Sequence, residues 1–133
     1  MDYASGTGTN YVQKWIGKNL SKKEAANVEA LLDILSKKKE WSEPDYRPLQ
    51  GSKYKEFALG EIRLKGDQKI PIRLIGFFDT GAKQFVILMV CRHKDNVYTP
   101  PECLDTALAR YKQLARGVGI IEEHFNDEDE EAV

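Results

Sequence analysis

The residues best suited to chemistry in this sequence are two arginines and a histidine that lie within or at the end of apolar runs. Arg63 and Arg73 occupy two successive runs, and His93 ends a third run between Arg92 and Lys94. Guanidinium groups bind phosphate through planar, permanently charged forks, and an imidazole exchanges protons near neutral pH. These residue types favour contact with a polyanion such as the backbone of RNA or DNA.

We expect the first two runs to form an antiparallel hairpin whose loop, residues 66–68, determines the face on which each side chain lies. A loop of this length places Lys65 opposite Lys69, and one face then collects apolar side chains: Ile62, Leu64, Ile70, Ile72 and Leu74. The other face collects charged side chains: Glu61, Arg63, Lys65, Lys69 and Arg73. A loop shorter by one residue would turn Arg73 toward the apolar side, which a half-buried sheet resists.

In the third run, residues 84–94, the side chains from Phe85 to Cys91 are apolar at both odd and even positions. This pattern is typical of a central strand covered on both faces. If this strand keeps an even register against the second, His93 shares the charged face. Aromatic residues in the flanking loops could stack on unpaired bases: Tyr46, Tyr54 and Tyr98. The alternative is a solvated charged face, with the tyrosines covering the edges of the core.

Two amphipathic helices are expected before these strands. Apolar residues recur at helical spacing over 9–20, and Ser21-Lys22-Lys23-Glu24 is a capping box that begins a second helix. The segment 41–51 contains two prolines and is interpreted as a loop. A last helix begins at Thr99-Pro100-Pro101-Glu102, with the threonine as its cap, and ends at Gly117. The predicted architecture is an α+β domain, in which an N-terminal helical hairpin packs on a small antiparallel sheet of about three strands, with a C-terminal helix.

The distribution of charge divides the chain into two parts. The 133 residues include 20 basic and 21 acidic ones, but all the basic residues lie at or before Arg116, and seven acidic residues lie in the last twelve positions. Residues 1–121 therefore carry a net charge of +6, and residues 122–133 carry −7. We expect a flexible Gly/Ser-rich N-terminus over 1–8, one domain over 9–121 and a disordered acidic tail over 122–133.

Several classes of protein are disfavoured by composition. The longest apolar run is far shorter than the ~18 residues that a membrane-spanning helix needs, and the N-terminus has no apolar signal core. Two cysteines, Cys91 and Cys103, are too few for a disulfide framework or a metal site. We therefore expect a cytoplasmic protein with reduced thiols, no membrane contact, no metal and no cofactor.

From Val12 onward the sequence resembles the RelE/ParE toxin superfamily, and most of all its phage-derived HigB-like branch. The resemblance follows the helical hairpin and then a series of short segments: Trp41, Pro48-Leu49-Gln50-Gly51, Glu61-Ile62-Arg63, Ile72-Arg73-Leu74, Phe77-Phe78, His93-Lys94, Thr99-Pro100-Pro101-Glu102 and Ala107-Leu108-Ala109-Arg110. Members of this family usually begin with a strand, whereas residues 1–8 here have no strand pattern. The resemblance implies a RelE-like fold.

The resemblance also implies a function. Many members are toxins of type II toxin–antitoxin pairs that cut messenger RNA on the ribosome without a metal, by attack of the 2′-hydroxyl on phosphate. Four residues are then expected to be catalytic: Arg63, Arg73, His93 and Lys94. Four more are expected to contact nucleic acid: Lys65, Lys69, Arg92 and Tyr98. The implied partners are an antitoxin protein of the helix-turn-helix type, messenger RNA and the ribosome. The alternative is a noncatalytic protein of this fold, either a gyrase-type inhibitor or a nucleic-acid-binding phage remnant.

Overall fold

The computed structural model describes most of the chain. The described residues are 2–4, 10–37, 41, 45–66, 70–79, 84–94, 97–117 and 120–122. The helices within them are α1 (Tyr11–Asn19), α2 (Lys22–Ser36), α3 (Ser52–Lys55) and α4 (Cys103–Ala115). The strands are β1 (Asp2–Ala4), β2 (Tyr46–Pro48), β3 (Gly60–Lys65), β4 (Pro71–Asp79), β5 (Gln84–Lys94), β6 (Val97–Thr99) and β7 (Ile120–Glu122).

The strands form one sheet with the order β2-β3-β4-β5-β1-β7, and β6 pairs with the end of β5. Strands β2 to β6 pair antiparallel, whereas β1 runs parallel to β5. The α+β class is therefore confirmed, but the prediction of about three strands was wrong. The four unpredicted strands, β1, β2, β6 and β7, have three residues each, which is too short for an alternating pattern to be visible.

The two chain ends differ from the expected boundaries. Asp2–Ala4 was expected to be flexible, but it forms β1, in which Asp2 pairs with Ile87 of β5 and with Glu122 of β7. Glu122 was expected to open the acidic tail, and it is instead the last residue of a strand. The remainder of that tail, residues 123–133, lies outside the described residues.

Both helices of the predicted hairpin are present, and side chains cap their N-termini. The Asn10 side chain accepts a hydrogen bond from the Gln13 backbone N–H at 2.9 Å and so caps α1. The capping box of α2 is confirmed, because Ser21 Oγ accepts from the Glu24 N–H at 3.1 Å and Glu24 Oε1 accepts from the Ser21 N–H at 3.0 Å. Both helices therefore have their first free amide groups satisfied by side chains.

Two other local predictions were wrong. The segment 41–51 was interpreted as a loop, but it contains β2, which pairs with β3. Thr99 was expected to cap the last helix, but it ends β6 opposite Arg92, and α4 begins at Cys103. Gly117 does end this helix, with φ +76° and its N–H donating to the Leu114 carbonyl at 3.1 Å.

The hairpin of β3 and β4 has the predicted faces but not the predicted register. Lys65 lies opposite Pro71 rather than Lys69, because the loop is two residues longer and closes where the Gly66 N–H donates to the Ile70 carbonyl at 3.0 Å. A shift by two residues leaves every side chain on its original face. Ile62, Leu64, Ile72 and Leu74 therefore share one face, as predicted, whereas Ile70 lies outside both strands.

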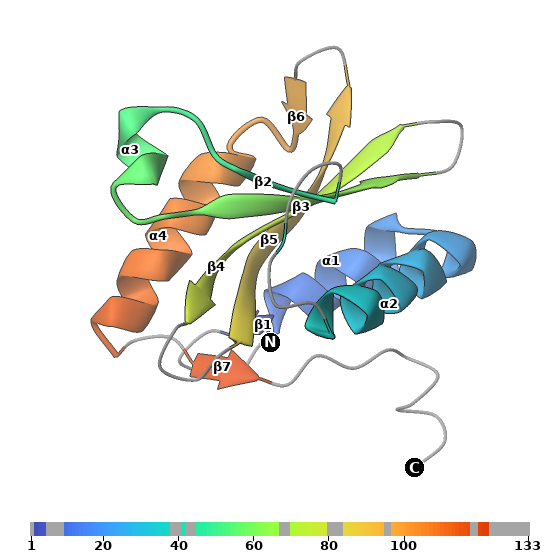
Figure 1. Ribbon diagram of the computed structural model, residues 1–133, viewed down its shortest axis with the longest axis horizontal. Coiled ribbons are helices and arrows are strands. Elements are labelled where there is room, and N and C mark those ends of the chain that lie inside the picture. Colours follow the sequence, from blue (N-terminus) through green and yellow to red (C-terminus); the bar gives the residue numbers. More distant parts are fainter. Residues whose placement is uncertain are drawn as a thin grey trace.

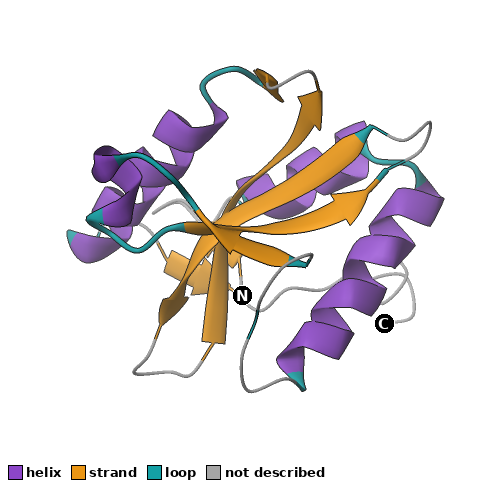
Figure 2. Cartoon of the chain, turned by 45° about the horizontal axis from the view of Figure 1, so that its top comes forward, coloured by secondary structure: helices purple, strands orange, loops and turns teal. Residues whose placement is uncertain are grey.

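Helices cover the sheet on both faces, with α1 and α2 on one side and α3 and α4 on the other (Figures 1 and 2). The core beneath α1 and α2 includes Val12, Ile16, Val28, Leu35, Ile62, Ile72, Leu74 and Val90. The core beneath α4 includes Leu59, Ile75, Val86, Leu88, Met89, Cys91, Cys103, Ala107 and Leu108. Strand β5 contributes to both cores and is buried from Phe85 to Cys91, which confirms its predicted central position.

Candidate functional site

Three central strands bring the predicted site residues onto one face of the sheet. Arg63 lies directly opposite Arg73 in the register of β3 and β4, and Arg73 lies opposite Cys91 in the register of β4 and β5. His93 is two residues beyond Cys91 and therefore shares this face, as the sequence predicted. We call the following five residues the arginine cluster: Glu61, Arg63, Arg73, His93 and Tyr98.

Glu61 lies at the centre of the arginine cluster. Its Oε1 atom is 3.4 Å from Arg63 Nε and 3.8 Å from Arg73 Nε, and its Oε2 atom accepts a hydrogen bond from the Tyr98 hydroxyl at 2.9 Å. One carboxylate therefore contacts two guanidinium groups and a phenol. The three residues that contact it come from β3, β4 and β6.

Burial differs among these charged groups. The side chains of Arg73 and Glu61 are 9% and 7% exposed, whereas that of Arg63 is 27% exposed. Within the described part of the chain, neither Arg63 Nε nor Arg73 Nε has a hydrogen-bond partner, although both lie within ion-pair distance of Glu61. Buried polar groups are normally hydrogen-bonded, so two unsatisfied guanidinium N–H groups in one place are unusual. Both N–H groups are buried beside Glu61, so an anion would reach them only by displacing its carboxylate.

The cluster also changes the protonation of its members. Burial lowers the pKa of Arg73, the Arg63 charge lowers it further, and Glu61 opposes both effects. The pKa of His93 falls below its ordinary value of 6.5, first because of burial and then because of the nearby Arg73 charge, with Glu61 again opposing. His93 is therefore neutral at pH 7, with a free nitrogen lone pair that can accept a proton.

Tyr98 covers the histidine. The two residues are opposite each other in the register of β5 and β6, and their ring centroids are 4.6 Å apart with an interplanar angle of 47°. Burial raises the pKa of Tyr98, and the Glu61 charge raises it further, so the phenol stays protonated and donates to the carboxylate. Tyr98 was expected in a loop, and its position in β6 makes it part of the cluster.

The structure places two other predicted residues, Arg92 and Lys94, on the opposite side of β5 from the cluster. Arg92 lies on the opposite face of β5, where its Nη1 and Nη2 atoms donate to Glu24 at 2.8 and 2.7 Å and so join the sheet to α2. Lys94 is exposed at the end of β5 and alternates onto the same side as Arg92. Lys65 is exposed at the end of β3, two residues beyond Arg63 on the face of the cluster. Lys69 lies outside the described residues.

Sequence reasoning missed the central role of Glu61. The residue was placed on the charged face but was given no function, although its spacing of two from Arg63 is the signal for contact on one side of a strand. It also missed the proximity of the two thiols. Cys91 contacts Cys103, and this contact together with burial raises the pKa of Cys91. The Cys91 Sγ donates to the Arg73 carbonyl at 3.8 Å.

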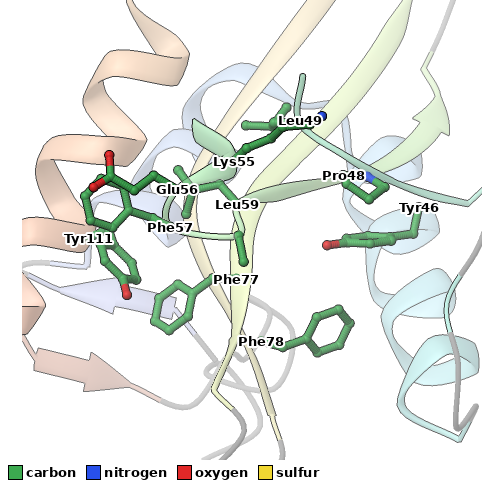
Figure 3. A pocket seen from close by; sticks show the side chains of 11 residues that line it. Tyr46, Pro48, Leu49, Lys55, Glu56, Phe57, Leu59, Phe77, Phe78 and Tyr111 are labelled. Carbon is green, nitrogen blue, oxygen red and sulfur yellow. The ribbon is translucent and has the colours of Figure 1, made fainter. Parts of the chain in front are cut away.

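A separate pocket of about 780 Å³ lies at the other end of β4 (Figure 3). Aromatic side chains form much of its lining, with Phe77 packed on Tyr111 and Phe78 packed on Tyr46. Its charged lining residues are Lys55 and Glu56, both exposed at the end of α3. No member of the arginine cluster lines this pocket, so the groups suited to acid–base and phosphate chemistry lie elsewhere.

Comparison with known proteins gives no match: no family profile, no curated protein and no solved structure matches the chain. Among the described residues, no group of three or more His, Cys, Asp or Glu side chains is placed to hold a metal ion. No helix in this part of the chain has both the length and the apolar character needed to cross a membrane. The function is therefore argued from the arginine cluster and from the resemblance of the sequence.

Proposed function

We propose that this protein is a RelE/ParE-type toxin, a ribosome-dependent endoribonuclease that cuts messenger RNA and is neutralised by a small antitoxin protein. The observation that carries the proposal is the convergence of Arg63, Arg73 and His93 on one face, around a single carboxylate. Strand pairing fixes the relative positions of these residues, as a site for phosphate chemistry requires.

The chemistry assigns a role to each group. Neutral His93 accepts the proton of the ribose 2′-hydroxyl, and the 2′-oxygen then attacks the adjacent phosphorus. The bond from phosphorus to the 5′-oxygen breaks, leaving a 2′,3′-cyclic phosphate, and the 5′-oxygen takes a proton from water. The hydroxide that remains takes the proton from His93 and restores the neutral imidazole. Arg63 and Arg73 stabilise the extra negative charge that develops on the phosphate oxygens during attack. Lys94 and Lys65, exposed at their strand ends, attract the flanking RNA backbone.

The order of elements supports the same proposal. Strand β1 precedes the two helices and pairs parallel with β5, which supplies the initial strand that members of this family usually have. The long antiparallel strands β3, β4 and β5 follow, and α4 comes after them. This element order, together with the arginines of β3 and β4, supports the proposal.

A ribosome-programmed cleavage assay tests the proposal. We expect the wild-type protein to cut messenger RNA, and we expect Arg73→Ala to lower the rate by about 100-fold or more, the usual cost of losing one group that stabilises transition-state charge. Arg116→Ala is the matched control, because this exposed arginine follows α4 and is outside the cluster. Equal cleavage by the wild type and Arg73→Ala would contradict the proposed role of the arginine.

One observation favours a noncatalytic alternative. The Arg73 side chain is largely buried, and Lys94 lies on the opposite side of β5 from His93. His93 is therefore the one group of the cluster that the proposed mechanism can use for proton transfer. A nucleic-acid-binding protein or a gyrase-type inhibitor would need no proton transfer. Growth arrest on induction with intact messenger RNA would support this alternative, whereas arrest with defined messenger breaks supports the toxin endoribonuclease.

A further inference from the structure

Glu61 is the one acidic member of the arginine cluster, and it is almost fully buried. A buried carboxylate between two guanidinium groups balances charge, which by itself is a structural role. The ion pairs lack hydrogen bonds at two atoms, however, because neither Arg63 Nε nor Arg73 Nε forms a hydrogen bond although both lie near the same Glu61 oxygen. Glu61 therefore neutralises the two arginines without saturating their donors.

We propose that Glu61 occupies the position of a substrate phosphate and acts as an internal competitor that an incoming phosphate displaces from Arg63 and Arg73. A phosphodiester carries a single negative charge on two free oxygens, so it presents to guanidinium groups the same charge and the same kind of acceptor as a carboxylate. The inference rests on the proposed function for the identity of this phosphate as part of an RNA chain.

One hydrogen bond and one difference in exposure favour this exchange. The Tyr98 hydroxyl holds Oε2 of Glu61 at 2.9 Å, so the carboxylate keeps one hydrogen bond when its other oxygen moves away from the arginines. The Arg63 side chain is more exposed than that of Arg73, so Arg63 is the member of the pair that an incoming anion would meet first. Tyr98 thus acts as a positioning residue, which works through Glu61.

The exchange has a consequence for selectivity. Any anion that binds the two arginines must first overcome their attraction to Glu61, which weakens the binding of small anions that make no other contact. An RNA strand makes further contacts through its neighbouring phosphates and bases, which offset this cost. Glu61 therefore biases the site toward extended polyanions and away from free phosphate.

Glu61→Gln tests the proposal, because glutamine has the same shape and still accepts from Tyr98 but carries no charge. We expect this variant to bind inorganic phosphate, measured by calorimetry at low salt, about tenfold more tightly than the wild type. Glu56→Gln is the matched control, since it makes the same change in net charge at an exposed position away from the cluster. Equal affinities in the Glu61→Gln and Glu56→Gln variants would overturn the proposal.

A second variant, Tyr98→Phe, tests the proposal without Glu61→Gln, because unchanged or tighter phosphate binding by this single variant would contradict a role of Tyr98 through Glu61. Tyr98→Phe removes the hydrogen bond that would hold Glu61 after its other oxygen leaves the arginines, so phosphate affinity should fall by a fewfold in the otherwise wild-type protein. In the Glu61→Gln background the same change should have little effect, because the competing charge is absent. An equal loss in both backgrounds would show that Tyr98 contacts the anion directly, which contradicts a role through Glu61.

Cleavage is measured separately, so the two proposals can fail independently. Tighter phosphate binding by Glu61→Gln in a protein that cuts no RNA would support the internal competitor and reject the endoribonuclease. Cleavage by the wild type that is lost in Glu61→Gln, with phosphate affinity unchanged, would make Glu61 a proton-transfer group and reject the competitor.

Discussion

Arg63 and Arg73 lie directly opposite each other in the register of β3 and β4, and the Glu61 carboxylate contacts both guanidinium groups. Like charges at opposed positions destabilise a sheet, and this pair is also partly removed from water. The carboxylate offsets that repulsion. The fold thus tolerates a concentration of positive charge at this point because one buried acid accompanies it.

Glu61→Ala should therefore lower stability strongly. The change leaves two guanidinium groups without a counter-charge and removes the acceptor of the Tyr98 hydroxyl, so we expect the free energy of unfolding to fall by about 3–5 kcal/mol. Urea unfolding followed by circular dichroism measures this difference. Glu56→Ala, at an exposed position, should leave the transition midpoint nearly unchanged. A loss for Glu61→Ala no larger than that of the control would mean that the two arginines need no internal partner.

Arg92 provides a second test of buried charge, on the other face of the sheet. Its two contacts with Glu24 join β5 to α2, and the Glu24 side chain is 2% exposed. Arg92→Met would leave that carboxylate buried with one partner fewer, so we expect a loss of about 3 kcal/mol in the free energy of unfolding. The exposed pair of Lys37 and Asp33 is the control, and Lys37→Met should have no measurable effect.

The same variant separates structural from functional arginines. Arg92 was predicted to contact nucleic acid, but its side chain is committed to α2, whereas Arg73 lies within the cluster. Arg92→Met, assayed at a temperature where the protein remains folded, should retain RNA cleavage while Arg73→Ala loses it. Loss of cleavage in both folded variants would place Arg92 in the functional site after all.

Local patterns predicted the parts of the fold that depend on neighbours in sequence. The capping box at Ser21 and Glu24 and the burial of Phe85–Cys91 follow from spacing and composition alone, and both were confirmed. The common face of Arg63 and Arg73 was also predicted correctly, although the register was wrong, because a shift by two residues preserves the alternation.

Contacts between distant segments could not be predicted in this way. Strand β1 has three residues and gains its strand conformation from pairing with β5 and β7, which lie far along the chain. Arg92 was predicted to contact nucleic acid. Its actual partner, Glu24, precedes it by 68 positions, and a contact over that separation leaves no local pattern in the sequence. Glu61 was recognisable as a charged neighbour of Arg63, but its contact with Tyr98 depends on β6, another strand too short to predict.

The two thiols should be unreactive in the folded protein. Cys91 and Cys103 are both buried, and the pKa of Cys91 is raised first by its contact with Cys103 and then by burial. Because the thiolate is the reactive form, we expect Ellman's reagent to modify neither thiol in native buffer and both in denaturant. Rapid modification of one thiol in native buffer would show that the core beneath α4 opens readily.

His93 gives the site a predictable dependence on pH. Burial and the charges of Arg73 and Arg63 lower its pKa, whereas Glu61 raises it, and Tyr98 covers the ring. The pKa should therefore lie below 6.5 in the wild type and move back toward that value in Arg73→Gln, where one neighbouring cation is lost. NMR titration measures both values, and a His124→Gln background leaves one imidazole signal.

The lowered pKa also has a consequence for stability. At pH values between the folded pKa of His93 and 6.5, the unfolded chain binds more protons than the folded chain, so the free energy of unfolding rises with pH across this interval. The contribution of His93 to stability is therefore complete above pH 6.5 and is lost as the pH falls through the folded pKa. His93→Gln should flatten this part of the stability profile.

In the cleavage assay, neutral His93 should sustain the wild-type rate below pH 6.5, whereas Arg73→Gln should begin to lose its residual rate at a higher pH. The proposed base would be a different group if both proteins lost activity at the same pH.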